Sequence, residues 1–238
     1  MVGVGIVGAS GFTGSELLRI CASHPFFDLV VATADTQAGS AVADLYPSLA
    51  AAYPGVTFVP TSPEAIDGCE VVFLCLPHGV SQEFVPTMLE AAGLVVDLGA
   101  DFRLRDPDLY PTWYGEVHRS PQLLTQAVYG LPELFGSTLE GARLVAAPGC
   151  YPTAAALALA PFLRAFAVET DGIVVDAASG ASGAGRALKN DTAFCAVDED
   201  FSAYALLMHR HTPEIEQVLA SDSTGALTQE VSVLFTPH

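Results

Sequence analysis

The chain has 238 residues, of which 51% are hydrophobic and 15% charged, so it has the composition of a folded protein rather than a disordered one. It carries 9 basic and 27 acidic residues, which gives a formal net charge of −18. A surface this negative argues against nucleic acid and against an anionic membrane as partners. An anionic ligand must therefore bind where the surface is locally less negative than the protein as a whole.

The sequence carries no sign of secretion or membrane insertion. Its amino terminus lacks a basic segment, and no uninterrupted apolar stretch approaches the roughly 18 residues of a transmembrane helix. Its five cysteines are scattered and form no CxxC pair. We therefore expect reduced thiols in a cytoplasmic protein, with neither a disulfide framework nor a metal site.

The first half alternates short apolar strands with helices. We expect strands over residues 2–7, 29–33, 71–76, 94–98 and 143–147, and helices over residues 12–23 and 81–92. Because each strand is apolar throughout, both faces of the sheet must be covered. This pattern predicts a doubly wound parallel sheet in a domain over residues 1–149.

The second half has a different organisation. Between residues 101 and 141, repeated prolines predict loops and short pieces. Beyond them we expect helices over residues 152–166 and 213–220, and strands over residues 173–178 and 229–235. Residues 150–238 are therefore expected to form an α+β domain, incomplete because it ends directly after a strand.

A glycine pattern, Gly8-x-x-Gly11-x-x-Gly14, follows the first strand and opens the first helix. Glycines in this place permit a tight turn and let backbone N–H groups approach a diphosphate at a helix N-terminus. Ser10 and Thr13 add hydroxyl donors. The pattern predicts a dinucleotide site, and a tight turn without a ligand is the alternative. No arginine stands nearby to hold a 2′-phosphate, so the spacing does not distinguish NADP from NAD.

Cys150 stands between the end of a strand and a helix that has a proline in its first turn, in the segment Pro-Gly-Cys-Tyr-Pro-Thr. At such a position free N–H groups and the positive end of a helix dipole converge. This setting favours a thiolate and offers donors to an oxyanion. It predicts a nucleophile rather than an inert buried cysteine, the usual fate of the residue type.

Two histidines, His209 and His211, precede the helix that starts at Pro213. Either could serve as the general acid and base for a thiol, because imidazole titrates near neutral pH. A metal site is disfavoured because no cysteine or aspartate cluster completes it. Solvated loop histidines are the alternative.

Further residues could hold anions or a cofactor. The turn over residues 179–186 could hold an anion, through the backbone at Ser182 and Gly183 and the cation of Arg186. A flexible loop without a ligand is the alternative for this segment. Two other segments follow strand ends, at the ligand-binding edge of the predicted sheet. Arg103 in one could hold a carboxylate or phosphate, and Pro77-His78 in the other would lie near a nicotinamide.

Taken in order, these motifs resemble those of the N-acetyl-γ-glutamyl-phosphate reductase family of arginine biosynthesis, over nearly the whole chain. The matching segments are GASGFTGSELLR, FLCLPHG, DLGADFRL, YGLPEL, APGCYPTAA, SGASGAGR and HRHTPEIEQ. The resemblance implies a Rossmann domain joined to a substrate and oligomerisation domain of the glyceraldehyde-3-phosphate dehydrogenase type. It also implies NADP as cofactor, a homo-oligomer (dimer or tetramer) in the full-length form, and a C-terminal truncation of this chain, because family members continue further.

The resemblance also implies a mechanism. Cys150 would attack the acyl phosphate of a small-molecule substrate, N-acetyl-L-glutamyl 5-phosphate, and NADPH would reduce the thioester to the semialdehyde. His209, or in second place His211, would move the proton, and backbone amides around Cys150 would stabilise the oxyanion. The expected substrate ligands are Arg103, Arg186 and His211. The expected cofactor ligands are Gly8, Ser10, Gly11, Phe12, Thr13, Gly14, Thr33, Pro77, His78, Ser182 and Gly183.

Two alternatives remain at this point. One is another acyl-phosphate reductase of the same superfamily, of the aspartate-semialdehyde or aminoadipyl-phosphate type, although Tyr151-Pro152-Thr153 after the cysteine favours the arginine pathway. The other is a nucleotide-binding module without catalysis, which only the truncation supports.

Overall fold

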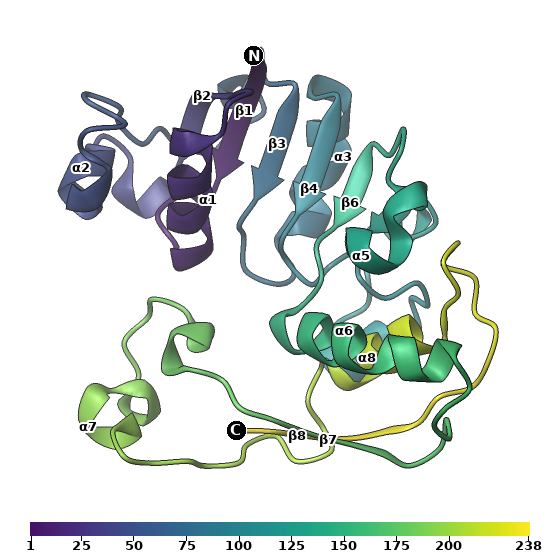
Figure 1. Ribbon diagram of the computed structural model, residues 1–238. Helices are drawn as coiled ribbons and strands as arrows, with labels where there is room; N and C mark the ends of the chain where they lie inside the picture. Colours follow the sequence, from purple (N-terminus) through teal and green to yellow (C-terminus); the bar gives the residue numbers. More distant parts are fainter. The chain divides into compact units, whose positions relative to one another are not determined.

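The computed structural model describes all 238 residues, which form two compact units (Figure 1). The first unit comprises residues 1–102 and 142–146, and the second comprises residues 103–141 and 147–238. The loop-rich segment after residue 102 thus groups with the second half of the chain, whereas the boundary at residue 149 stays a prediction. None of the helices combines the length and apolar character that crossing a bilayer requires.

The first unit is built on parallel strands, which confirms the predicted sheet type. Its strands lie in the order β2-β1-β3-β4-β6, so the connections cross over from the centre to both sides. The strands are β1 (Val2–Val7), β2 (Phe27–Thr33), β3 (Val71–Leu74), β4 (Leu94–Asp97) and β6 (Leu144–Ala146).

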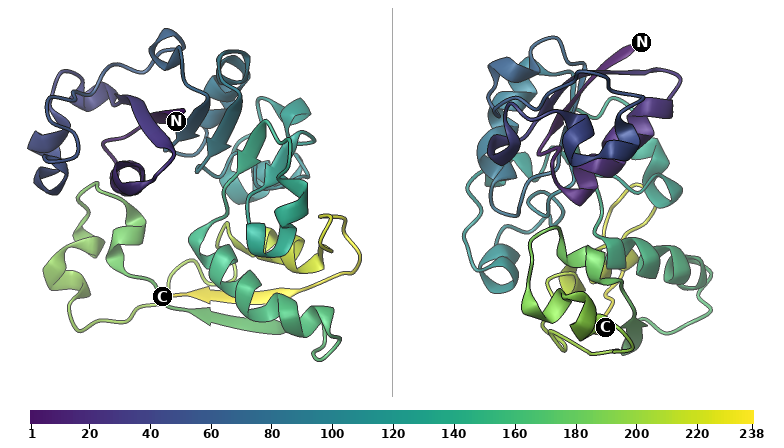
Figure 2. Two further views of the ribbon diagram at one scale, coloured as in Figure 1. Left: turned by 45° about the horizontal axis from the view of Figure 1, so that its top comes forward. Right: turned by 90° about the vertical axis from the view of Figure 1, so that its left-hand side faces the viewer.

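Helices cover both faces of this sheet, as a doubly wound fold requires. Helix α1 (Phe12–Ser23) lies on one face and α3 (Ser81–Ala91) on the other, while the short α2 (Val42–Leu45) lies beyond β2 (Figures 1 and 2). Leu18 of α1 is fully buried in a core that includes Ile6 of β1. This packing places the turn between β1 and α1 at the carboxyl end of the central strand, where ligands bind in such folds.

The second unit consists of two longer helices and a two-stranded sheet, with short elements around them. Figure 1 shows α6 and α8 side by side, and both contribute buried residues to one core with the parallel pair β7–β8. The elements are α4 (Leu109–Tyr114), β5 (Ala127–Tyr129), α5 (Pro132–Phe135), α6 (Cys150–Arg164), β7 (Ile173–Ala177), α7 (Phe194–Val197), α8 (Thr212–Ala220) and β8 (Val233–Pro237).

The last strand differs from its predicted range of residues 229–235. Strand β8 pairs with β7 from Ile173–Val233 to Ala177–Pro237, so its bounds are those of its partner. Gln229 lies outside the ladder and donates its side-chain amide to the carbonyl of Leu219, 3.2 Å away. The hydrophobic alternation therefore identified the strand but placed it too early in the chain.

Candidate active site

Cys150 is the first residue of α6, and its side chain is exposed. Gly149 caps the helix, and its carbonyl accepts hydrogen bonds from the N–H (2.9 Å) and the hydroxyl (2.8 Å) of Thr153. The N–H groups of Cys150 and Tyr151 donate to no acceptor in the protein, and Pro152 has none to donate. A thiol and two free N–H donors therefore share one helix terminus, the arrangement that stabilises an oxyanion.

Gly149 allows two cationic or basic side chains to approach the residue before Cys150. A Cβ atom on Gly149 would lie 2.7 Å from His211 Nε2 and 2.9 Å from Arg103 Nη1. Both distances are shorter than van der Waals contact, so only glycine fits here without a shift of a neighbour. His211 and Arg103 therefore pack directly against the backbone that leads into the cysteine.

The two predicted histidines occupy different places. His211 caps α8, is 7% exposed, and has its pKa lowered to about 3 by burial, with smaller contributions from nearby His209 and the arginines Arg103 and Arg210. Burial, and next Arg210, lower the pKa of His209 to about 4. Both imidazoles are therefore neutral at pH 7. A neutral imidazole has an unprotonated nitrogen and can accept the proton of a thiol.

The two histidines also differ in their contacts. His209 Nδ1 accepts the backbone N–H of His211 at 3.0 Å, and the ring lies edge-on to Tyr151 and Phe235. His211 Nε2 instead lies against Gly149, and its Nδ1 has no hydrogen-bond partner. We therefore propose His211 as the proton-transfer group, rather than His209, which the family resemblance placed first.

A buried carboxylate that the sequence did not single out completes the site. Glu214 lies in the first turn of α8, and its side chain is 0% exposed. Its Oε1 accepts the N–H of Gly149 at 2.8 Å and the hydroxyl of Tyr129 at 2.7 Å. Burial, and next the Glu214 charge, raise the pKa of Tyr129, so its hydroxyl stays protonated. In the sequence, the only sign that Glu214 belongs to the site is its position within the segment HRHTPEIEQ.

Arg103, predicted as a substrate ligand, is 8% exposed and held within the second unit. Its Nε donates to the carbonyl of Ala147 at 2.8 Å, and its Nη1 lies 3.6 Å from Glu214 Oε2. Gln217 of α8 donates to its backbone carbonyl at 2.9 Å. The guanidinium thus balances the charge of the buried carboxylate, in addition to any contact with substrate.

The predicted dinucleotide turn lies in the first unit and has the geometry that a diphosphate needs. Gly8 has a φ of +78°, and a Cβ atom there would lie 2.5 Å from the carbonyl oxygen of Cys75. A Cβ on Gly14 would lie 2.5 Å from the Cα of Ala9. Gly11 is the N-cap of α1. The turn is therefore held close to the sheet, and no side chain caps the N-terminus of its helix, which fits a bound diphosphate.

Other predicted cofactor ligands surround this turn with different exposures. Phe12 and Thr13 are exposed, and the carbonyl of Ser10 accepts the hydroxyl of Tyr46 at 2.7 Å. Thr33 is fully buried and its hydroxyl is hydrogen-bonded to Thr61 at 2.8 Å. Its side chain is thus shielded in this structure from a ligand at the turn.

The segment Pro77-His78-Gly79 is fixed by a buried aspartate. Asp101 lies within ion-pair distance of His78 Nδ1 and accepts the N–H of Gly79 at 2.8 Å. Burial raises the pKa of Asp101, but the hydrogen bonds from His78 and Gly79 outweigh it and lower the pKa overall. Pro77 is exposed. An ionised carboxylate therefore sets the conformation of this predicted cofactor loop.

Ser182, Gly183 and Arg186 are all exposed, in and after a single short turn of helix at Ala181–Ala184. The N–H of Gly183 donates to the carbonyl of Gly180 at 3.0 Å. The structure places these residues in the second unit, and their role as ligands stays a prediction.

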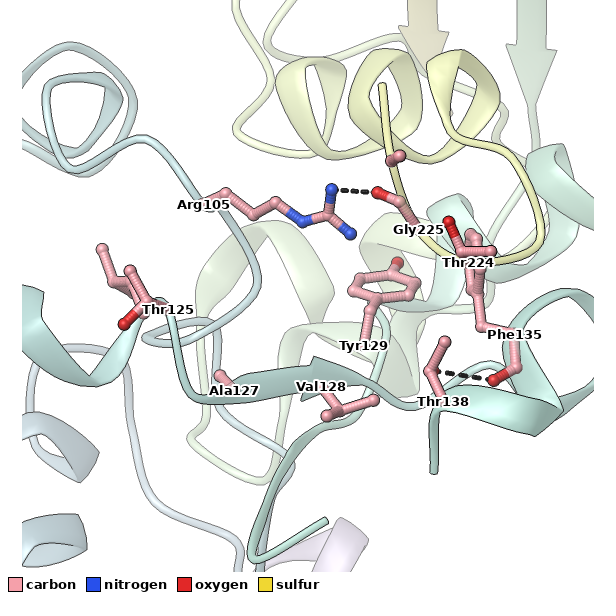
Figure 3. A pocket seen from close by; sticks show the side chains of 11 residues that line it. Arg105, Thr125, Ala127, Val128, Tyr129, Phe135, Thr138, Thr224 and Gly225 are labelled. Atoms are coloured by element: carbon pink, nitrogen blue, oxygen red, sulfur yellow. Dashed lines mark hydrogen bonds between the residues drawn. The ribbon is translucent and has the colours of Figure 1, made fainter. Parts of the chain in front are cut away.

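A cavity of about 420 Å³ lies in the second unit, and none of the predicted site residues lines it (Figure 3). Arg105 reaches across it to donate to the carbonyl of Gly225. The ring of Tyr129 forms part of its wall, next to Phe135. Tyr129 therefore has one side toward open space, while its hydroxyl contacts the buried Glu214.

Comparison with known proteins shows which family the chain is similar to. Residues 3–142 match a family described as semialdehyde dehydrogenase, NAD binding domain, and residues 150–238 match semialdehyde dehydrogenase, dimerisation domain. Among solved structures, the aspartate semialdehyde dehydrogenase with NADP from Candida albicans superposes with a TM-score of 0.72 at 14% identity, covering 100% of this chain and 67% of that one. One from Vibrio cholerae gives 0.67 at 15%, covering 100% and 70%. At these identities the likeness shows the fold alone, and it confirms the predicted fold class.

Similar sequences are more specific. Proteins named N-acetyl-gamma-glutamyl-phosphate reductase from Symbiobacterium thermophilum and Halorhodospira halophila are each 51% identical to this chain, over 99% and 100% of its length. The alignments cover 66% and 68% of those proteins, so the chain spans about two thirds of the length of these relatives. The resemblance drawn from the motifs is confirmed. The chain belongs to the semialdehyde dehydrogenase family, and within it to the N-acetyl-gamma-glutamyl-phosphate reductases.

Proposed function

We propose that this chain carries out the NADPH-dependent reductive dephosphorylation of N-acetyl-L-glutamyl 5-phosphate to N-acetyl-L-glutamate 5-semialdehyde, in arginine biosynthesis. The names of the relatives at 51% identity support the substrate. The observation that carries the chemistry is the exposed Cys150 at a helix N-terminus with two free N–H groups and a neutral, buried His211 against the preceding residue.

The first step is acyl transfer to the cysteine. The sulfur of Cys150 attacks the acyl carbon, the bond from that carbon to the phosphate oxygen breaks, and phosphate leaves. His211 accepts the thiol proton at Nε2, the nitrogen that faces Gly149. The N–H groups of Cys150 and Tyr151 donate to the oxygen that becomes negative during attack.

The second step returns the cysteine to its starting state. NADPH, held at its diphosphate by the glycine turn, would supply the hydride that takes the acyl group to the oxidation level of an aldehyde. The carbon–sulfur bond then breaks, and the thiolate of Cys150 recovers its proton from His211. The two N–H donors of the helix terminus stabilise the oxyanion in this step as well.

Three regions are proposed to hold the ligands. The turn at Gly8, Gly11 and Gly14 would hold the diphosphate of the cofactor, because its glycines bring the turn close to the sheet and no side chain caps the helix that follows. Arg103 and Arg186 remain the proposed ligands for the phosphate or carboxylate of the substrate. Guanidinium groups match both anions through paired hydrogen bonds.

We further propose that the chain forms a homo-oligomer, a dimer or tetramer, in the cytoplasm. The match of residues 150–238 to a dimerisation domain supports assembly. Five free cysteines, with no disulfide among them, fit a reducing compartment.

The reverse reaction tests the proposal. Purified protein is mixed with NADP, inorganic phosphate and one aldehyde in each of three assays. The three aldehydes are N-acetylglutamate semialdehyde, aspartate semialdehyde and N-acetylaminoadipate semialdehyde. Phosphate-dependent formation of NADPH with the first aldehyde, absent from Cys150→Ser, is the expected result. Preferential turnover of either other aldehyde would replace the proposed substrate. Turnover that persists in Cys150→Ser would remove the thioester route.

A further inference from the structure

Glu214 joins three segments that are far apart in the sequence at the residue before Cys150. Its Oε1 receives hydrogen bonds from Gly149, 65 positions away, and from Tyr129, 85 positions away. Because the side chain is 0% exposed, water does not compete for these bonds. The carboxylate therefore fixes the first turn of α8 to the start of α6.

The charges in this cluster balance one another. Glu214 Oε2 faces Arg103 Nη1 at 3.6 Å, and Arg103 is itself anchored to the carbonyl of Ala147. A buried carboxylate is tolerated only where donors and a counter-charge replace its water. Oε1 has one backbone donor and one hydroxyl donor, whereas Oε2 has no hydrogen-bond donor and only the guanidinium of Arg103 as its counter-charge.

The hydrogen bond from Gly149 also decides which N–H groups can reach the substrate. Because this N–H is donated to Glu214, it is not available to an oxyanion. The donors that remain are those of Cys150 and Tyr151. Their direction, and that of the Cys150 side chain, depends on the conformation of Gly149.

We infer that Glu214 and Tyr129 are positioning residues, which hold Gly149 so that the cysteine and its two N–H donors meet the acyl group in the reactive geometry. This inference rests on the proposed function. Neither side chain needs to touch the substrate, because both act through the Gly149 backbone. Misplacement of a reacting group by about 1 Å can cost about 100-fold in rate, so such residues affect kcat more than KM.

A substitution at Tyr129 can remove one hydrogen bond to Glu214 and leave the packing of the ring unchanged. Its ring lines the cavity of Figure 3 and lies edge-on to Phe135 with centroids 5.9 Å apart, contacts that phenylalanine preserves. Tyr129→Phe therefore removes only the hydroxyl that holds Glu214. Tyr53→Phe is the matched control, because Tyr53 is also buried and donates to a carbonyl, that of Leu18, at 2.7 Å in the first unit.

The experiment measures kcat and KM for phosphate-dependent oxidation of N-acetylglutamate semialdehyde, with urea unfolding as the check on folding. For Tyr129→Phe we expect kcat to fall about 10-fold, with KM within twofold. For Glu214→Ala we expect a fall of about 100-fold or more. Glu214→Gln should recover part of this loss, because its amide oxygen can still accept the N–H of Gly149. Tyr53→Phe should keep the kcat of the unmodified protein.

The outcomes separate the two proposals. The proposed function stands if the unmodified protein is active and Cys150→Ser is inactive. If Tyr129→Phe and Glu214→Gln then both keep full kcat, the positioning role alone fails. A raised KM with unchanged kcat would also overturn it, because Glu214 would then bind substrate directly. If Glu214→Ala does not fold, Tyr129→Phe and Glu214→Gln decide the question. An unmodified protein without this activity would overturn the proposed function, and the positioning role with it.

Discussion

The imidazole of His211 lies where a side chain on Gly149 would have to be, with Nε2 2.7 Å from the position of a Cβ atom. This close approach brings a neutral base next to the residue that precedes Cys150. It also gives Gly149 a role that backbone conformation alone does not explain, because its φ of −67° is open to any residue.

Gly149→Ala should therefore inactivate the protein without unfolding it. The added methyl group must displace His211 or Arg103, which should lower kcat by about 100-fold. The measurement is the phosphate-dependent assay, with the unfolding midpoint in urea to confirm the fold. Gly136→Ala is the control, because a Cβ atom there meets nothing within 4 Å and the backbone is in the right-handed helical region. Equal kcat in the two variants would show that His211 and Arg103 do not need their present positions.

The two histidines should differ in their effect on the rate. His211→Asn removes the proposed proton acceptor, and loss of general acid–base catalysis typically costs between about 100-fold and 10,000-fold. His209→Asn should cost less, because His209 only accepts the backbone N–H of His211, at 3.0 Å. Steady-state kinetics of both variants decide between them. A larger loss of kcat in His209→Asn would reverse the assignment.

Acid should destabilise the protein through these same histidines. Their folded-state pKa values, about 4 for His209 and about 3 for His211, lie below the value of 6.5 for an unperturbed imidazole. As the pH falls, the unfolded state binds protons first, so the stability that the neutral imidazoles contribute is full above about pH 6.5. It is lost progressively as the pH falls toward 4 and then 3.

Urea unfolding at pH 7.5 and pH 5 measures this effect. His211→Asn should lose less stability between the two values than the unmodified protein, because asparagine does not titrate. An identical loss in both proteins would show that the burial of His211 does not control the acid response.

The glycine turn gives a second steric prediction. Gly8→Ala combines a φ of +78° with a contact of 2.5 Å to the carbonyl of Cys75, so it should destabilise the first unit and weaken NADPH binding strongly. Gly39→Ala is the matched control, because Gly39 has a φ of +87° but open space around it. That variant should carry only the conformational cost, about 1–2 kcal/mol. Fluorescence titration with NADPH and urea unfolding compare the two, and equal effects would contradict the close-approach argument.

Local sequence patterns predicted the elements of the first unit closely. The range 12–23 predicted for the first helix is that of α1, because a glycine turn and Pro25 bound an amphipathic segment. The apolar runs at residues 71–76 and 94–98 became β3 and β4, shortened at their carboxyl ends. Pattern reasoning works here because start and stop signals lie next to the segments that they delimit.

The rest could not be read from local patterns. The bounds of β8 follow from its partner β7, which lies 60 positions earlier in the chain, and not from the hydrophobic alternation that starts at Gln229. Glu214 and Tyr129 went unrecognised because a buried carboxylate is defined by contacts across 65 and 85 positions. Likewise, the spacing of His209 and His211 does not show which ring faces Gly149. Motifs identify reactive residue types, whereas the roles proposed for these residues rest on tertiary contacts.

The central claim is that Cys150 forms the covalent bond to the substrate. The most direct measurement is intact-protein and peptide mass spectrometry after mixing the protein with N-acetylglutamyl 5-phosphate in the absence of NADPH. The account predicts one N-acetylglutamyl group per chain, located on Cys150, lost on addition of NADPH, and absent from Cys150→Ser. An unmodified Cys150 in a preparation that reduces this substrate once NADPH is added, or an acyl group on another residue, would contradict it.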